Sequence, residues 1–252
     1  MTVRHPNARR ADDGFFIGWQ AAMPAGHRRV SIIAALALML GAVAVMASIR
    51  VGLSTQEAGI FEFGSLREVT GTFMVEPVPM LLLDETIDGR EAAILVGSFK
   101  FGVPEGLRTH HGKRVQFAGT AIRHEAGLMI ELTDETSFTV LAEAPQRELA
   151  QHTVGQVSLT GELVDTKCFF GVMRPGFGKV HRACAARCLS GGVPPGLLIR
   201  DAQGLATVVM LRDGDIDPQW AARTIRVEGD LTINDGVPVV TVGNLELLPE
   251  DK

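Results

Sequence analysis

The chain has 252 residues, of which 46% are hydrophobic, and carries 24 Lys and Arg against 29 Asp and Glu, a formal net charge of −5. With this acidic balance, two Trp and no Tyr, the composition excludes a typical nucleic-acid binder, because phosphate attraction and aromatic base stacking are both lacking. Residues 1–50 carry six Arg and two Asp, so the excess of acid lies in residues 51–252, at −9.

Residues 30–50 form the first predicted element, a transmembrane helix. The run Val30–Ile49 is apolar over 20 residues, with only Ser31, Gly41 and Ser48 as small interruptions. At ~1.5 Å per residue, about 20 residues cross the ~30 Å hydrocarbon core of a bilayer. We therefore expect a membrane partner for this segment.

Arginines before this run predict the orientation of the chain. They place a tail of residues 1–29 in the cytoplasm and residues 51–252 outside it. The expected protein is a single-pass protein of the bacterial inner membrane with a periplasmic or otherwise extracytoplasmic domain. A signal peptide cleaved after Ala47 is the alternative, although the long leader and long apolar run favour an uncleaved anchor.

The remaining chain contains an internal repeat, with one copy at residues 60–143 and another at 154–249. Three pairs of segments match in spacing and pattern: 69–73 with 159–163, 77–84 with 194–201, and 112–119 with 222–229. Alternating apolar and polar residues and turn signals such as Asn234–Gly236 predict about five short strands in each copy.

Five short strands in 80 to 95 residues favour a small antiparallel barrel. Closure removes exposed sheet edges, and an OB-like barrel needs only five strands. The predicted fold class is therefore mainly β, with two tandem OB-like barrels after one transmembrane helix. A single larger β-sandwich is the alternative.

All three cysteines lie in a box at residues 165–195, between the first two strands of the second copy. The distance from glycine to proline is 8 residues in the first copy (Gly71 to Pro79) and 34 in the second (Gly161 to Pro195), so the second copy contains about 26 extra residues. A loop inserted into a regular scaffold is a common place for function.

The box has the residue types of a metal site. A helix expected over residues 179–189 would place His181, Cys184 and Cys188 on one face. With Cys168 they form a ligand set suited to zinc, and thiolates equally suit copper or an iron–sulfur cluster.

In an oxidising compartment, the same thiols are also expected to form a disulfide or a redox site. A disulfide could join Cys168 to Cys184 or Cys188 and leave one cysteine over. A reduced redox site is a third possibility, although the spacing of Cys184 and Cys188 differs from that of thioredoxin-like motifs.

Charged residues surround the cysteines. Asp165 is the expected carboxylate partner of the site. We interpret the nearby basic residues, together with Asp165, either as partners that support the thiols or as a docking surface for a membrane or periplasmic redox protein; they are Lys167, Arg174, Lys179, Arg182 and Arg187.

The box resembles one shared by a family of bacterial membrane-anchored proteins. It reads Cys-x-x-Gly-x-Met-x-Pro-Gly, then His-x-x-Cys-Ala-x-x-Cys-x-x-Gly-Gly-x-Pro-Pro, over Cys168–Pro195. The resemblance supports the box as a unit without implying a chemistry. With its single anchor and exterior OB barrel, the chain is also similar at fold level to the haem chaperone of cytochrome c maturation, whose haem-attaching histidine motif is not evident here.

No complete catalytic set accompanies the box in the sequence. We therefore expect a binding or assembly protein rather than an enzyme, in which the box binds a metal or docks a redox partner. The alternatives are a thiol oxidoreductase or electron-transfer protein, and a structural subunit of a membrane complex with a disulfide-stapled loop.

Overall fold

The computed structural model describes residues 23–54, 59–141, 147–201 and 206–249, in two compact units that divide after Gln56. The described residues of the first unit form one helix, α1 (Ala25–Ser54). Its stretch Ala25–Arg50 is long and apolar enough to span a membrane, and none of its most apolar window is buried by protein. The helix could thus anchor the chain, as predicted for residues 30–50. Most of the predicted cytoplasmic tail, residues 1–22, lies outside the described residues.

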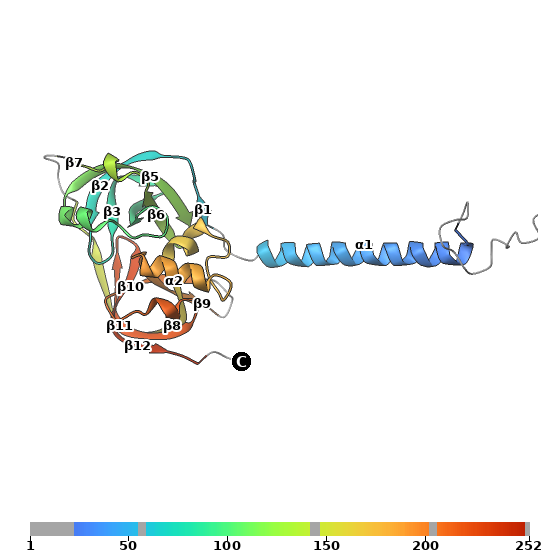
Figure 1. Ribbon diagram of the computed structural model, residues 1–252. Coiled ribbons are helices and arrows are strands. Elements are labelled where there is room, and N and C mark those ends of the chain that lie inside the picture. Colours follow the sequence, from blue (N-terminus) through green and yellow to red (C-terminus); the bar gives the residue numbers. More distant parts are fainter. Residues whose placement is uncertain (1–22, 55–58, 142–146, 202–205, 250–252) are drawn as a thin grey trace, which may run out of the picture. The chain divides into compact units, whose positions relative to one another are not determined.

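The second unit consists of two closed barrels of five strands each (Figure 1). The first barrel is formed by β2 (Arg67–Met74), β3 (Met80–Ile87), β4 (Arg90–Val96), β5 (Arg114–His124) and β6 (Gly127–Leu132). The second is formed by β8 (Gln151–Asp165), β9 (Pro195–Arg200), β10 (Ala206–Arg212), β11 (Thr224–Asn234) and β12 (Val237–Leu247). Two short strands, β1 (Ile60–Phe61) and β7 (Thr139–Val140), pair with β5.

Both barrels have the same topology. The first strand pairs with the second, the second with the third, the third with the fifth, the fifth with the fourth, and the fourth with the first. The third and fifth strands run parallel in each barrel, as β4 with β6 and β10 with β12, and the other pairs are antiparallel. The predicted pair of OB-like barrels is confirmed, and the single sandwich is excluded.

Two equivalent glycines show how closely the copies match. Gly71 on β2 and Gly161 on β8 both lie against the backbone of the next strand, where an added Cβ would collide with a carbonyl oxygen, that of Leu82 in one barrel and of Leu198 in the other. A strand glycine often marks such a close approach of two backbones. The matched segments 69–73 and 159–163 therefore occupy equivalent positions.

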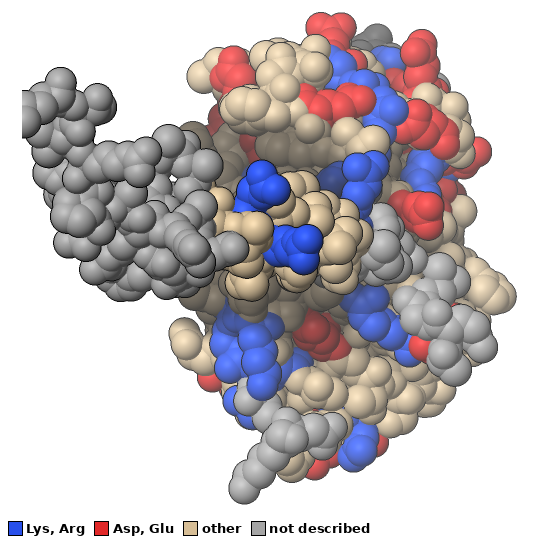
Figure 2. Space-filling model, turned by 90° about the vertical axis from the view of Figure 1, so that its right-hand side faces the viewer, with Lys and Arg blue, Asp and Glu red and all other residues tan. Residues whose placement is uncertain are grey.

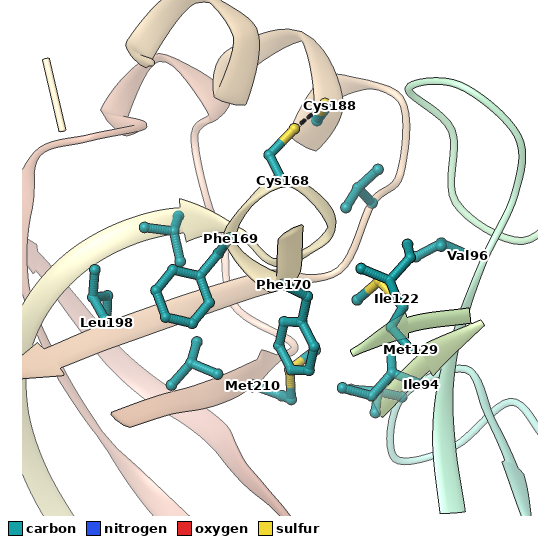
Figure 3. Packing of buried hydrophobic residues seen from close by; sticks show 14 of the residues in the cluster. Ile94, Val96, Ile122, Met129, Cys168, Phe169, Phe170, Cys188, Leu198 and Met210 are labelled. Atoms are coloured by element: carbon teal, nitrogen blue, oxygen red, sulfur yellow. Dashed lines mark hydrogen bonds between the residues drawn. The ribbon is translucent and has the colours of Figure 1, made fainter. Parts of the chain in front are cut away.

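Apolar side chains fill each barrel and also join the two barrels. Separate buried clusters occupy the two interiors, around Phe73 and Phe117 in the first and around Leu163 and Val227 in the second. A third buried cluster draws on both barrels. Its members include Ile94, Val96, Ile122, Met129, Phe169, Phe170, Leu198 and Met210. Figure 3 shows Phe169 and Phe170 between residues of the two barrels.

The box is the segment that supplies these two phenylalanines. It connects β8 to β9 through residues 166–194, whereas β2 and β3 are joined by residues 75–79. It contains one π-helical turn, η3 (Cys168–Val172), and a helix, α2 (Arg182–Ser190). The helix begins three residues later than predicted, because Lys179–His181 form a turn before it.

We predict that Gly71→Ala and Gly161→Ala each lower the free energy of unfolding by about 2 kcal/mol or more, because a methyl group forced against a backbone carbonyl overpacks the barrel. Gly106 has open space around its Cβ position and no positive φ, so Gly106→Ala serves as the control with little effect. Urea unfolding of the full chain in detergent, followed by circular dichroism, measures all three. Equal stability of the three variants would contradict the close approach.

Candidate metal centre

The three cysteine sulfurs converge between η3 and α2. Their Sγ atoms all lie within 4.8 Å of one another, and those of Cys168 and Cys188 are 4.0 Å apart (Figure 3). Cys168 and Cys188 are 2% and 1% exposed, while Cys184 is half-buried. All three are free thiols. Because a disulfide bond measures about 2.05 Å, the disulfide considered from the sequence is not formed in this structure.

Asp165, at the end of β8, organises the start of the box. Its carboxylate is fully buried. One oxygen accepts a hydrogen bond from the backbone N–H of Cys168 at 2.8 Å, and the other lies 3.0 Å from Nε2 of His181. The carboxylate thereby holds the turn that presents Cys168 and the residue that precedes α2, as expected for a partner of the site.

His181 belongs to a second, overlapping group. Its ring nitrogen, a carboxylate oxygen of Asp165 and the sulfur of Cys168 lie within 4.8 Å of one another. The predicted set of Cys168, His181, Cys184 and Cys188 is thus arranged as three sulfurs on one side and an Asp–His pair on the other, with Cys168 shared. Either group could hold a metal ion.

Lys100 is a site residue that sequence reasoning missed. It lies in the first barrel, between β4 and the 3₁₀ helix η1 (Glu105–His110). Its Nζ is 2.7 Å from Sγ of Cys184 and 3.8 Å from Sγ of Cys188. The box lies more than 60 residues further along the chain, and no local pattern marks this lysine, so only the packing of one barrel on the other could identify it.

The loop that carries Lys100 is held by both ends of the box. At one end, Nζ of Lys167 donates to the carbonyl oxygens of Gly97 and Phe99, at 2.7 Å each. At the other end, the N–H of Gly102 donates to the carbonyl of Gly191 at 2.9 Å, and an added Cβ at Gly191 would collide with the carbonyl oxygen of Lys100. These contacts direct the Lys100 side chain toward the thiols.

Lys167 itself is buried. Its side chain is 1% exposed, and Nζ is 2.6 Å from a carboxylate oxygen of Glu131 on β6. Lys167 therefore cannot form part of a docking surface, and neither can the buried Asp165, so of the two roles considered from sequence only that of a partner supporting the site is left to these two residues. A charge in this position is retained only when paired and hydrogen-bonded.

The other predicted basic residues lie nearer the surface and also make contacts within the domain. Arg174 donates to the carbonyl of Gly59 at 3.0 Å, Arg182 donates to that of Ala222 at 3.3 Å, and the Arg187 guanidinium lies 5.6 Å from the ring centre of Phe101. Lys179 is exposed. On the face shown in Figure 2, most of the acidic side chains lie over the upper half, which is the first barrel. A group of basic side chains lies at the lower left of the same face.

The thiols differ in acidity. The hydrogen bond with Cys168 lowers the pKa of Cys188, and the nearby charge of Lys100 adds to this effect. The same hydrogen bond, together with burial and the negative charge of Asp165, raises the pKa of Cys168. The contact with Cys184 raises the pKa of Lys100. The two shifts have opposite signs and favour the thiolate on Cys188 over that on Cys168.

Searches against protein families, curated proteins and solved structures find no match to this chain. The chemistry of the site must therefore be argued from its own residues.

We predict that Lys167→Met destabilises the protein by about 3–5 kcal/mol, because it leaves the Glu131 carboxylate buried without its partner. The double variant Lys167→Met, Glu131→Gln should recover part of this loss, since the uncompensated charge is removed. Arg226 and Glu246 form an exposed pair on β11 and β12, so Arg226→Met is the control, with an expected cost below about 1 kcal/mol. A double variant no more stable than Lys167→Met would count against a buried ion pair.

We also predict the order in which the thiols react in the reduced, metal-free protein. Cys184 should be alkylated first because it alone is half-exposed, and Cys168 last because it is buried and its raised pKa keeps it protonated near neutral pH. Quenched iodoacetamide labelling with peptide mass spectrometry measures each rate. The same rate for all three before unfolding would be inconsistent with this arrangement.

Proposed function

We propose that the protein is a membrane-anchored metal-binding protein in which Cys168, Cys184 and Cys188 hold one thiophilic ion, with Cu(I) as the preferred ion. The observation that carries the proposal is the convergence of the three sulfurs within 4.8 Å. Two sulfurs bound to one trigonal ion, with bonds of about 2.3 Å, are about 4 Å apart. The Cys168–Cys188 separation is 4.0 Å.

The donor set argues for Cu(I) over zinc and over a cluster. Structural zinc is almost always four-coordinate, and among the described residues no fourth His, Cys, Asp or Glu joins the three sulfurs. Cu(I) is a soft ion that prefers thiolates and is satisfied by three of them. An iron–sulfur cluster spreads three cysteines over at least two iron atoms, which places at least one sulfur farther from the others than binding to a single ion does.

Two features support binding of an ion that can be exchanged. The Lys100 ammonium lies against the sulfurs and offsets the negative charge that three thiolates leave after one Cu(I) is bound. Cys184 is half-buried whereas the other two cysteines are fully buried, so it is the ligand that an incoming or departing carrier can reach first. Both suit a protein that receives an ion and passes it on.

The anchor supports a location for the site outside the cytoplasm. The apolar α1 and the arginines that precede it favour a domain outside the cytoplasm, and the box resembles that of other membrane-anchored bacterial proteins. In that setting the protein acts in metal assembly, and its partner is a membrane or periplasmic redox protein that contains copper.

Metal analysis of the full chain in detergent tests the proposal. The reduced protein is loaded with Cu(I) under anaerobic conditions, desalted and analysed for copper. We expect one ion per chain in the wild type and at least a tenfold lower content in Cys168→Ser and Cys188→Ser, because a hydroxyl is a poor ligand for a soft ion. Ser190 is exposed on α2, and Ser190→Ala should bind as the wild type does.

Parallel loading with Zn²⁺ separates the ions. Retention of zinc but not copper, with loss in His181→Asn, would support the four-ligand zinc site predicted from sequence instead. Neither ion retained at stoichiometric level would refute metal binding.

A second candidate function rests on the close approach of Cys168 and Cys188 and on their opposite pKa shifts. Such a pair could cycle between dithiol and disulfide in a thiol oxidoreductase. Under this alternative, the metal experiment yields no stoichiometric ion, and mild oxidation yields a Cys168–Cys188 disulfide that glutathione or dithiothreitol reverses.

A further inference from the structure

The contact between Lys100 and Cys184 is unusually short for a nitrogen and a sulfur. Nζ and Sγ are 2.7 Å apart, the lower end of the range of about 2.7–3.2 Å for N–H···O hydrogen bonds. Sulfur is the larger acceptor, so an N–H···S bond is expected to be longer. Among the described residues, the thiols are the only charged or ionisable partners of this ammonium.

The surrounding structure holds the two atoms together. Phe99, next to Lys100, has a φ of 56°, a left-handed conformation that is uncommon for a bulky residue. Lys167 bonds to the carbonyl of Phe99, and Gly102 bonds to Gly191 beyond the end of α2. These contacts fix the loop on both sides of Lys100, and the backbone of Cys184 is part of α2. The backbone positions therefore keep the Lys100 and Cys184 side chains next to each other.

We infer that Lys100 and Cys184 are a site of oxidative crosslinking, in which one oxygen atom bridges Nζ and Sγ. A single bridging oxygen, with ordinary covalent bonds to nitrogen and sulfur, spans a separation like the one observed. The half-buried Cys184 is open to a small oxidant, and partly exposed thiols near positive charge are the reactive ones.

The reaction balances with dioxygen as the oxidant. The thiol loses its S–H hydrogen, the neutral amine loses one N–H hydrogen, and the O=O bond breaks. One oxygen forms the S–O and N–O bonds of the bridge, and the other leaves as water with the two hydrogens. A lysine that starts as ammonium releases one further proton. Sulfur and nitrogen are oxidised while dioxygen is reduced, and a dithiol reductant reverses the step by cleaving the bridge.

The crosslink would also regulate the metal site, a consequence that rests on the proposed function. It removes the half-exposed sulfur from the ligand set and converts the neighbouring ammonium into a neutral group. The oxidised protein would then bind Cu(I) more weakly, and reduction would restore binding. The crosslink would also join the two barrels covalently, since Lys100 belongs to the first and Cys184 to the second.

Peptide mass spectrometry of the full chain, purified in detergent under air and without reductant, tests the crosslink. Trypsin should leave residues 91–108 uncut at Lys100 and joined to residues 183–187. The mass should equal the sum of the two peptides plus one oxygen minus two hydrogens. Dithiothreitol should release both peptides. Lys100→Met should abolish the species, whereas Lys113→Met, which changes an exposed lysine, should retain it.

Complete cleavage at Lys100 together with full alkylation of Cys184 in the unreduced protein would refute the crosslink, as would oxidation of Cys184 to sulfenic acid alone. Copper loading of the reduced protein is measured on the same preparation. If the crosslink forms but copper does not bind at stoichiometric level, the crosslink is supported and the metal function is refuted. If copper binds but no crosslink forms, the metal function is supported and the crosslink is refuted.

Discussion

The buried ammonium of Lys167 is the contact on which the arrangement of the site depends. Lys167 lies near the start of the box, which is part of the second barrel. Its three partners, Gly97, Phe99 and Glu131, all belong to the first barrel. A buried charge is stable only when its hydrogen bonds are satisfied, so the loop of the first barrel must stay in place. That loop supplies Lys100, which therefore reaches the thiols only when the two barrels are packed together.

The repeated barrel explains how such a site can arise. Both copies have the same strand order and place an equivalent glycine at Gly71 and Gly161. The first copy joins its first two strands directly, whereas the second uses this connection for the box. The box in turn fills the space between the copies with Phe169 and Phe170. One insertion thus provides the three clustered sulfurs, the packing between the barrels and the ion pair with Glu131.

The chemistry of the cluster depends on which sulfurs are reachable. Two buried sulfurs share a hydrogen bond, while Cys184 is half-exposed and touches Lys100. An ion bound by all three would be held firmly by two ligands and exposed at the third. The same exposure makes Cys184 the first sulfur that an oxidant would meet, so under the proposed function metal exchange and oxidation would compete for one atom.

Much of this could be predicted from the sequence because it depends on local patterns. The apolar run predicts α1, alternating residues and turn signals predict the ten barrel strands, and the spacing of Gly71 and Gly161 to their prolines locates the insertion. The cysteines and Asp165 are close in the chain, so their proximity in the fold follows from one turn and one short helix.

Only the tertiary structure decided the rest, because it depends on contacts between distant segments. Lys167 reads as a surface charge in the sequence and becomes buried because Glu131 and two carbonyl groups meet it from the other barrel. His181 faces Asp165 instead of completing a ring of four ligands. Lys100 has no local signal at all. It reaches Cys184 only because two OB-like barrels pack against each other across the box.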